Sequence, residues 1–172
     1  MKLTKELTLT ASFTALLIGA QLVLASISGI EVVSVLIISY CYYFGARRGM
    51  ILATAFSLLR CFLFGFFPAI IILYLIYYNL LAIVIGWLGR RPNKRSGVKE
   101  LIVVCVFALI MTVCFTMLDN VVTPLFYAFS PETTRAYFAT SIITLVPHCF
   151  CVVITVALLF IPLCKIYKMA NL

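Results

Sequence analysis

The sequence predicts an all-α membrane protein of six transmembrane helices, and three observations lead to this prediction. Hydrophobic residues make up 65% of the 172 residues and charged residues only 10%, whereas about a quarter of the residues in a soluble domain are charged. Six long apolar stretches follow one another along the chain, as expected for helices that each need about 20 apolar residues to cross a bilayer. Eleven of the thirteen Lys and Arg residues lie in four short segments that alternate with these stretches.

The basic segments predict the orientation of the chain. They are Lys2/Lys5, Arg47/Arg48, the run Arg90, Arg91, Lys94, Arg95 and Lys99, and Lys165/Lys168. If the apolar stretches cross the membrane in turn, every basic segment lies on one face, which the positive-inside rule makes cytoplasmic together with both termini. The formal charge of +8 then reflects topology and contact with anionic lipid, so no nucleic-acid partner is expected. A single integral membrane domain, residues 1–172, accounts for the whole length.

The predicted helices follow in order along this domain. They cover residues 7–27, 32–44, 50–64, 69–88, 100–118 and 137–162. The first is longer than the core of a secretory signal, about 7–15 residues, so we expect it to remain in the mature protein. The second ends in a turn from Gly45 to Gly49, because glycine accepts the backbone angles of a sharp reversal. Pro68 suits the first position of the fourth helix.

The last two helices are expected to be joined by the longest loop on the outer face. Its residues, 119–135, contain Pro124 and Pro131. The middle of this segment, residues 125–129, is too apolar for a solvated loop. We therefore expect it to fold back against the helices.

Familiar catalytic patterns are absent from the sequence. No G-x-x-x-x-G-K-[ST] loop is present to hold ATP phosphates, and neither G-x-S-x-G nor H-E-x-x-H occurs. The seven cysteines form no C-x-x-C pair, so they predict neither a disulfide framework nor a zinc site and are interpreted as small buried hydrophobes. We therefore expect no enzymatic activity, no metal and no cofactor.

Arg60 is a basic residue that lies at membrane depth, and the predicted orientation of the chain in the membrane does not explain its position. An ionisable side chain at this depth is costly, so each one is a candidate functional residue. We expect Arg60 to pair with Glu31 or with an anionic group of a ligand. The alternative is a side chain that extends to the outer headgroups.

A group of polar and aromatic residues shares the outer half of the predicted bundle. Tyr74, Tyr77 and Tyr78 are spaced to lie on one face of the fourth helix, close to Asn79 at mid-depth. Such a face suits a planar, polar small molecule, and packing between helices is the alternative.

Asp119 and Asn120 end the fifth predicted helix on the outer side, where simple solvation is the alternative to a binding role. His148 follows Pro147, which frees a backbone carbonyl near it. A histidine hydrogen-bonded within a core is the alternative there.

Helix one carries a different pattern. Ala11, Ala15 and Gly19 recur every four residues, which places small residues along one stripe. Such a stripe lets another helix approach closely.

These features together resemble the substrate-binding S component of energy-coupling factor (ECF) transporters, which are small six-helix membrane proteins that capture vitamins or related micronutrients. The length, the number of crossings, the cytoplasmic termini and the basic loop between helices four and five all fit. The family's Ala-x-x-x-Ala motif corresponds to Ala11 to Ala15, and the turn from Phe44 to Gly49 is similar to the family's glycine-bounded turn.

The resemblance implies a substrate-capture subunit in a prokaryotic plasma membrane, with a transmembrane coupling subunit and two ATPases as partners. It implies that the stripe of Ala11, Ala15 and Gly19 docks on the coupling subunit. It also selects a set of substrate-binding residues on the outer side. These are Glu31, Arg60, Tyr74, Tyr78, Asn79, Asp119, Asn120 and His148.

Two points stay open at this stage. Some vitamin branches of the family have a proline-rich start of helix two, whereas this chain has Ile-Glu-Val-Val-Ser at residues 30–34, so no particular vitamin follows. The alternative function is a small multi-pass scaffold for envelope assembly, similar to the rod-shape morphogenesis membrane proteins. Such a scaffold needs no outward-facing polar pocket.

Overall fold

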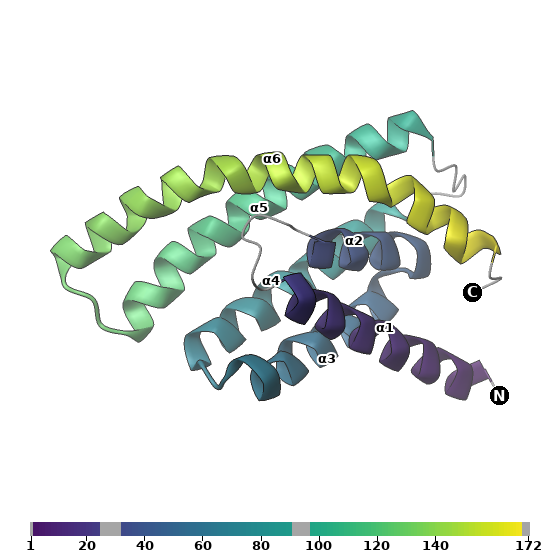
Figure 1. Cartoon of the computed structure of the whole chain (residues 1–172), viewed down its shortest axis with the longest axis horizontal. Coiled ribbons are helices and arrows are strands. Elements are labelled where there is room, and N and C mark those ends of the chain that lie inside the picture. The colour runs from purple at the N-terminus through teal and green to yellow at the C-terminus, as the bar shows by residue number, and fades with distance from the viewer. Residues whose placement is uncertain (1, 25–31, 91–96, 170–172) are drawn as a thin grey trace.

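A computed structural model of the chain describes residues 2–24, 32–90 and 97–169, and within these ranges the chain forms six helices and no strand (Figure 1). The helices are α1 (Lys2–Leu24), α2 (Val32–Phe44), α3 (Ala46–Phe64), α4 (Pro68–Leu88), α5 (Val98–Phe126) and α6 (Pro131–Met169). The predicted all-α class is confirmed. The expected bounds of α2 match the structure, and α4 begins at Pro68 as predicted.

Membrane character is carried by four of the described helices. The segment Glu6–Leu24 of α1 and the whole of α4, α5 and α6 are long and apolar enough to cross a bilayer. Helix α2 is apolar but has only 13 residues, which is about 20 Å at 1.5 Å per residue. Helix α3 contains three arginines. Crossing of the membrane by α2 and α3 therefore stays a prediction.

Helix α2 forms the centre of the bundle. Every residue from Ser34 to Tyr42 is buried, and the helix packs against α1, α3, α4 and α6. A helix that is apolar on all sides is stable only when it is surrounded, and the continuous Val, Leu and Ile content of α2 agrees with that position.

The turn between α2 and α3 is shorter than expected. Gly45, with φ of 87°, makes the whole reversal, because α3 already begins at Ala46. Gly49 lies inside α3 instead of closing the turn, and its lack of a side chain lets Cys41 approach. A Cβ added at Gly49 would lie 2.5 Å from Cys41 Sγ. The prediction that both glycines form the turn is therefore wrong for Gly49.

The described parts of the basic segments gather at one end of the bundle, which we call the basic end. Arg48 at the start of α3 forms an ion pair with Glu6 near the start of α1. The ring of Tyr167, near the end of α6, lies 5.5 Å from that of Phe44. Gly89, after α4, packs on Tyr42. This clustering agrees with the charge pattern, and the assignment of the basic end to the cytoplasm stays a prediction.

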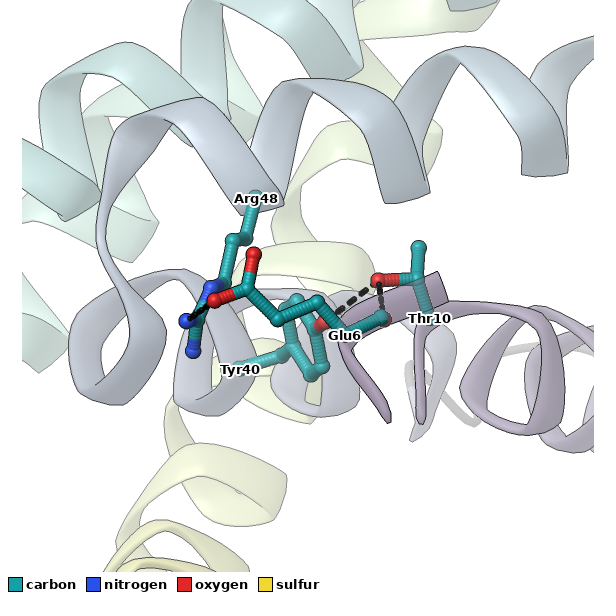
Figure 2. A network of polar contacts seen from close by, with 4 residues as sticks. All are labelled: Glu6, Thr10, Tyr40 and Arg48. Atoms are coloured by element: carbon teal, nitrogen blue, oxygen red, sulfur yellow. Dashed lines mark hydrogen bonds and ion pairs between the residues drawn. The ribbon is translucent and has the colours of Figure 1, made fainter. Parts of the chain in front are cut away.

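A polar network ties α1 to its neighbours at the basic end (Figure 2). Thr10 Oγ1 donates a hydrogen bond to the Glu6 carbonyl at 2.9 Å, so its single proton is used. The Tyr40 hydroxyl, 3.0 Å away, is therefore the donor to Thr10 Oγ1. With the ion pair between Arg48 and Glu6, this network joins α1, α2 and α3.

Helices α5 and α6 form a long hairpin that extends past the ends of the other helices (Figure 1). Their connection is only Tyr127 to Ser130, so the expected long loop at residues 119–135 is wrong. Pro124 lies inside α5, near its end, where it has no N–H to donate to the carbonyl of Asn120. Ser130 Oγ accepts a hydrogen bond from the Thr133 N–H at 3.2 Å and so caps the start of α6.

The cysteines follow the expected pattern only in part. Cys41 and Cys164 are buried, Cys114 is exposed, and the other four are partly buried. All seven are free thiols. The interpretation as buried hydrophobes therefore holds fully for two positions, and Cys105 is partly buried against the hydrophobic core.

Candidate functional site

A cavity of about 270 Å³ lies at the end of the bundle opposite the basic end. We call it the far-end cavity. One wall comes from the adjoining ends of α3 and α4, and the other comes from α5 and the start of α6. Its polar lining residues are Arg60, Tyr74, Asp119, Thr123, Tyr127 and Tyr137, and its apolar ones are Ile70, Leu73 and Phe115.

Arg60 is held in this cavity by aromatic rings. It lies near the end of α3, and its guanidinium carbon is 4.5 Å from the centroid of the Tyr74 ring and 4.9 Å from that of Phe64. Its Nε is buried and has no hydrogen-bond partner among the described residues. Ring contacts of this kind attract the cation but use none of its in-plane N–H donors. The Nε donor is thus enclosed by protein without a partner among the described residues, and the N–H groups that a solute in the cavity would meet are those on the terminal nitrogens of the guanidinium.

Asp119 faces the same cavity from α5. Its Oδ1 accepts a hydrogen bond from Thr123 Oγ1 and its Oδ2 accepts one from the Tyr137 hydroxyl, both at 2.6 Å. Both partners are neutral, and the one ion pair in the described ranges joins Arg48 to Glu6, at the other end. Asp119 and Arg60 therefore lie on one cavity without a direct ion pair between them.

The tyrosine face of α4 divides between the cavity and the core. Tyr74 lines the cavity, whereas Tyr77 and Tyr78 are buried in the hydrophobic core. The Tyr78 ring packs edge-on at 5.4 Å from Phe56, and the Tyr77 ring at 4.7 Å from Phe115. Packing between helices thus describes Tyr77 and Tyr78, and Tyr74 is the member of this face that a ligand can reach.

The remaining candidates lie elsewhere. Asn79 accepts a hydrogen bond from Thr54 Oγ1 at 3.2 Å and donates to the Leu75 carbonyl at 2.8 Å, so it joins α4 to α3. Asn120 donates to Ser141 Oγ at 2.7 Å and joins α5 to α6. His148 is half-buried on α6 and does not line the far-end cavity. Glu31 lies outside the described residues. Arg60, Tyr74 and Asp119 are the candidates that the cavity brings together.

Sequence reasoning missed the polar residues that line the cavity beside Asp119. Thr123 and Tyr127 follow it by four and eight residues, which places them on its face of a helix. That signal was hidden because α5 was expected to end before Asp119. Tyr137 comes from α6, and only the antiparallel packing of the hairpin brings its hydroxyl to the carboxylate.

The small-residue stripe of α1 lines a second concave surface, which we call the α1–α3 groove. Its volume is about 570 Å³, and Ala11, Ala15 and Gly19 line it together with residues of α3 such as Ala55. Ala11 and Ala15 are exposed there. A Cβ added at Gly19 would have no neighbour within 4 Å. The groove therefore has room for a side chain or a helix from another protein.

No protein-family model, no curated protein and no solved structure matches the chain. The far-end cavity and the α1–α3 groove are therefore the features from which a function can be argued.

Proposed function

We propose that this chain is the substrate-capture subunit of an ECF-type importer in a prokaryotic plasma membrane. In this role it binds a vitamin or related micronutrient from outside and delivers it inward together with a transmembrane coupling subunit and two ATPases. The observation that carries the proposal is the far-end cavity, in which Arg60 and Asp119 offer charged groups to a solute.

The position of the cavity supports uptake from outside. It lies opposite the basic end, and the positive-inside rule assigns the basic end to the cytoplasm. Ionisable residues are retained in membrane segments chiefly where they serve a function, because their burial is costly. The cavity volume of about 270 Å³ is slightly below the range of about 300–1,000 Å³ for ligand pockets, which suits a solute as small as a micronutrient.

The α1–α3 groove supports a protein partner in the membrane. Membrane helices associate through close packing at small residues, and Ala11, Ala15 and Gly19 supply such a surface along α1. The sequence has no motif for ATP phosphates, so energy for transport has to come from a partner. Docking of the coupling subunit in this groove satisfies both observations.

Bulky substitutions in the groove are expected to abolish association with the coupling subunit. The test is purification of the tagged full chain in mild detergent from its own host, with the bound proteins identified by mass spectrometry. The wild-type chain should retain a transmembrane subunit and two ATPases. The double variant Ala11→Trp/Ala15→Trp should lose them, because each indole fills the space that a partner helix needs.

Leu16→Trp is the matched control, since Leu16 is 51% exposed on the same helix but does not line the groove. It should keep the partners. Association that survives the double variant would contradict the docking assignment. Recovery of envelope-assembly proteins in place of ATPases would favour the scaffold function instead.

A further inference from the structure

We infer that the far-end cavity takes a small ring-bearing zwitterion, whose anionic group pairs with Arg60 and whose amine pairs with Asp119. This inference rests on the proposed function, since it takes the cavity to be the capture site. It adds the chemical class of the solute, which neither the charge pattern nor the fold class supplies.

The Arg60 side of the cavity suits a carboxylate. The rings of Tyr74 and Phe64 contact the guanidinium, and these contacts leave its in-plane N–H groups available. Arg60 lines the cavity and forms no ion pair in the described part of the chain. A guanidinium with available donors matches the two oxygens of a carboxylate, which can accept two parallel hydrogen bonds.

The Asp119 side suits an amine. Each carboxylate oxygen already accepts one hydrogen bond from a hydroxyl, and these bonds from Thr123 and Tyr137 fix its orientation. Hydroxyl groups hold the carboxylate without neutralising it, and each oxygen keeps a further lone pair. An ammonium group of a ligand would supply both the missing charge and the missing donor.

Charge balance favours a ligand that carries both an anionic group and an amine over a ligand that carries only one of them. Arg60 and Asp119 line the same cavity without a direct ion pair. A simple anion would pair with Arg60 but leave Asp119 without a cation, and a simple amine would do the reverse. A charge that a bound ligand shields from water without pairing it is unfavourable. A zwitterion compensates both charges at once.

The walls between the charged residues suit a flat apolar body. The rings of Tyr74 and Phe115 lie 6.0 Å apart and at 63° to each other, and Leu73 and Ile70 add aliphatic surface. Aromatic surfaces of this kind pack well against another ring. The ligand class is therefore an amino acid or related zwitterion that carries a ring.

The test compares ligands that differ by one charged group. L-tryptophan is compared with tryptamine, which lacks the carboxylate, and with indole-3-propionate, which lacks the amine; L-tyrosine is compared with its corresponding analogues. Binding is measured by calorimetric titration of the full chain in lipid nanodiscs. Each amino acid is expected to bind at least about tenfold more tightly than either of its analogues, because each analogue leaves one charged side chain unpaired.

Two variants assign the groups. The Arg60→Gln protein should bind L-tryptophan no more tightly than tryptamine, which lacks the carboxylate. It should still bind L-tryptophan more tightly than indole-3-propionate, which lacks the amine. In Asp119→Asn the opposite loss is expected; the amide keeps one oxygen that can accept from one of the two hydroxyls, and its N–H can donate to the other. Arg135→Gln is the control, because Arg135 is exposed on α6 and outside the cavity; it should bind as the wild type does.

Equal affinity for an amino acid and its analogues in the wild-type chain would overturn the inference. So would the absence of binding by either amino acid at millimolar concentration. These outcomes leave the proposed function intact, because association with a coupling subunit and ATPases is measured separately. If the wild-type chain distinguishes the ligands as expected but does not associate with a coupling subunit and ATPases, only the proposed function is contradicted.

Discussion

Gly86→Ala is expected to destabilise the folded chain by up to about 2 kcal/mol, which is the overpacking cost less the gain in helix propensity. A Cβ at Gly86 would lie 2.3 Å from the backbone nitrogen of Ala46 and 2.4 Å from its Cα, and backbone atoms cannot move aside as a side-chain end can. Overpacking of this kind costs about 1–3 kcal/mol or more. Alanine is better than glycine in a helix by about 1 kcal/mol, so the clash has to exceed that gain. Thermal unfolding of the purified chain in detergent measures the difference.

Gly19→Ala is the matched control for this prediction. Gly19 is also inside a helix, but an added Cβ there meets nothing within 4 Å. The substitution should leave the unfolding temperature unchanged or raise it slightly, through helix propensity alone. If Gly86→Ala unfolds at the wild-type temperature, the close packing of α4 on the start of α3 is wrong.

Arg60→Ala is expected to weaken binding of the captured solute on the order of 100-fold, because truncation of one partner in a desolvated charge pair costs about 2–5 kcal/mol. The measurement is titration with the solute that is released when the wild-type protein is denatured. The physical reason is the loss of the donors that Arg60 offers to an anionic group, together with its contact with the Tyr74 ring.

Two comparisons separate a binding role of Arg60 from a structural one. Arg135→Ala removes the same charge from an exposed position on α6 and should not change the affinity. Asn79→Ala should have a small effect, since the amide is occupied by Thr54 and by the Leu75 carbonyl. An Arg60→Ala protein that binds as tightly as the wild type would remove Arg60 from the site.

Local chemical signals predicted much of the fold. The reversal at Gly45 follows from a backbone conformation with φ of 87°, which glycine adopts readily. The start of α4 at Pro68 follows from the fixed φ of proline, which suits a first helical position. The end of α5 was missed because Pro124 was taken as part of a loop. Proline at this position removes one helical hydrogen bond, but contacts with α6, such as the bond from Asn120 to Ser141, support the continued helix.

The candidate site was predictable where charge alone identified a residue. Arg60 was selected because an ionisable group is costly at membrane depth, and Asp119 was selected as an outer-side residue that the family resemblance implies; both line the far-end cavity. Spacing along α4 could not decide which tyrosines reach it, because that depends on how the helix is rotated against α3 and α5. Tyr78 faces the core for this reason, while Tyr74 faces the cavity.

The central claim is that the far-end cavity captures a small solute, and mass spectrometry of what co-purifies with the chain tests it most directly. Wild-type protein and the Arg60→Ala and Arg135→Ala variants are purified from rich medium, and the small molecules released on denaturation are quantified. A solute present in near-equal molar amount with the wild-type and Arg135→Ala proteins, and lost from Arg60→Ala, is the predicted result. The same released molecules in equal amounts from all three proteins, or none from the wild type, would contradict it.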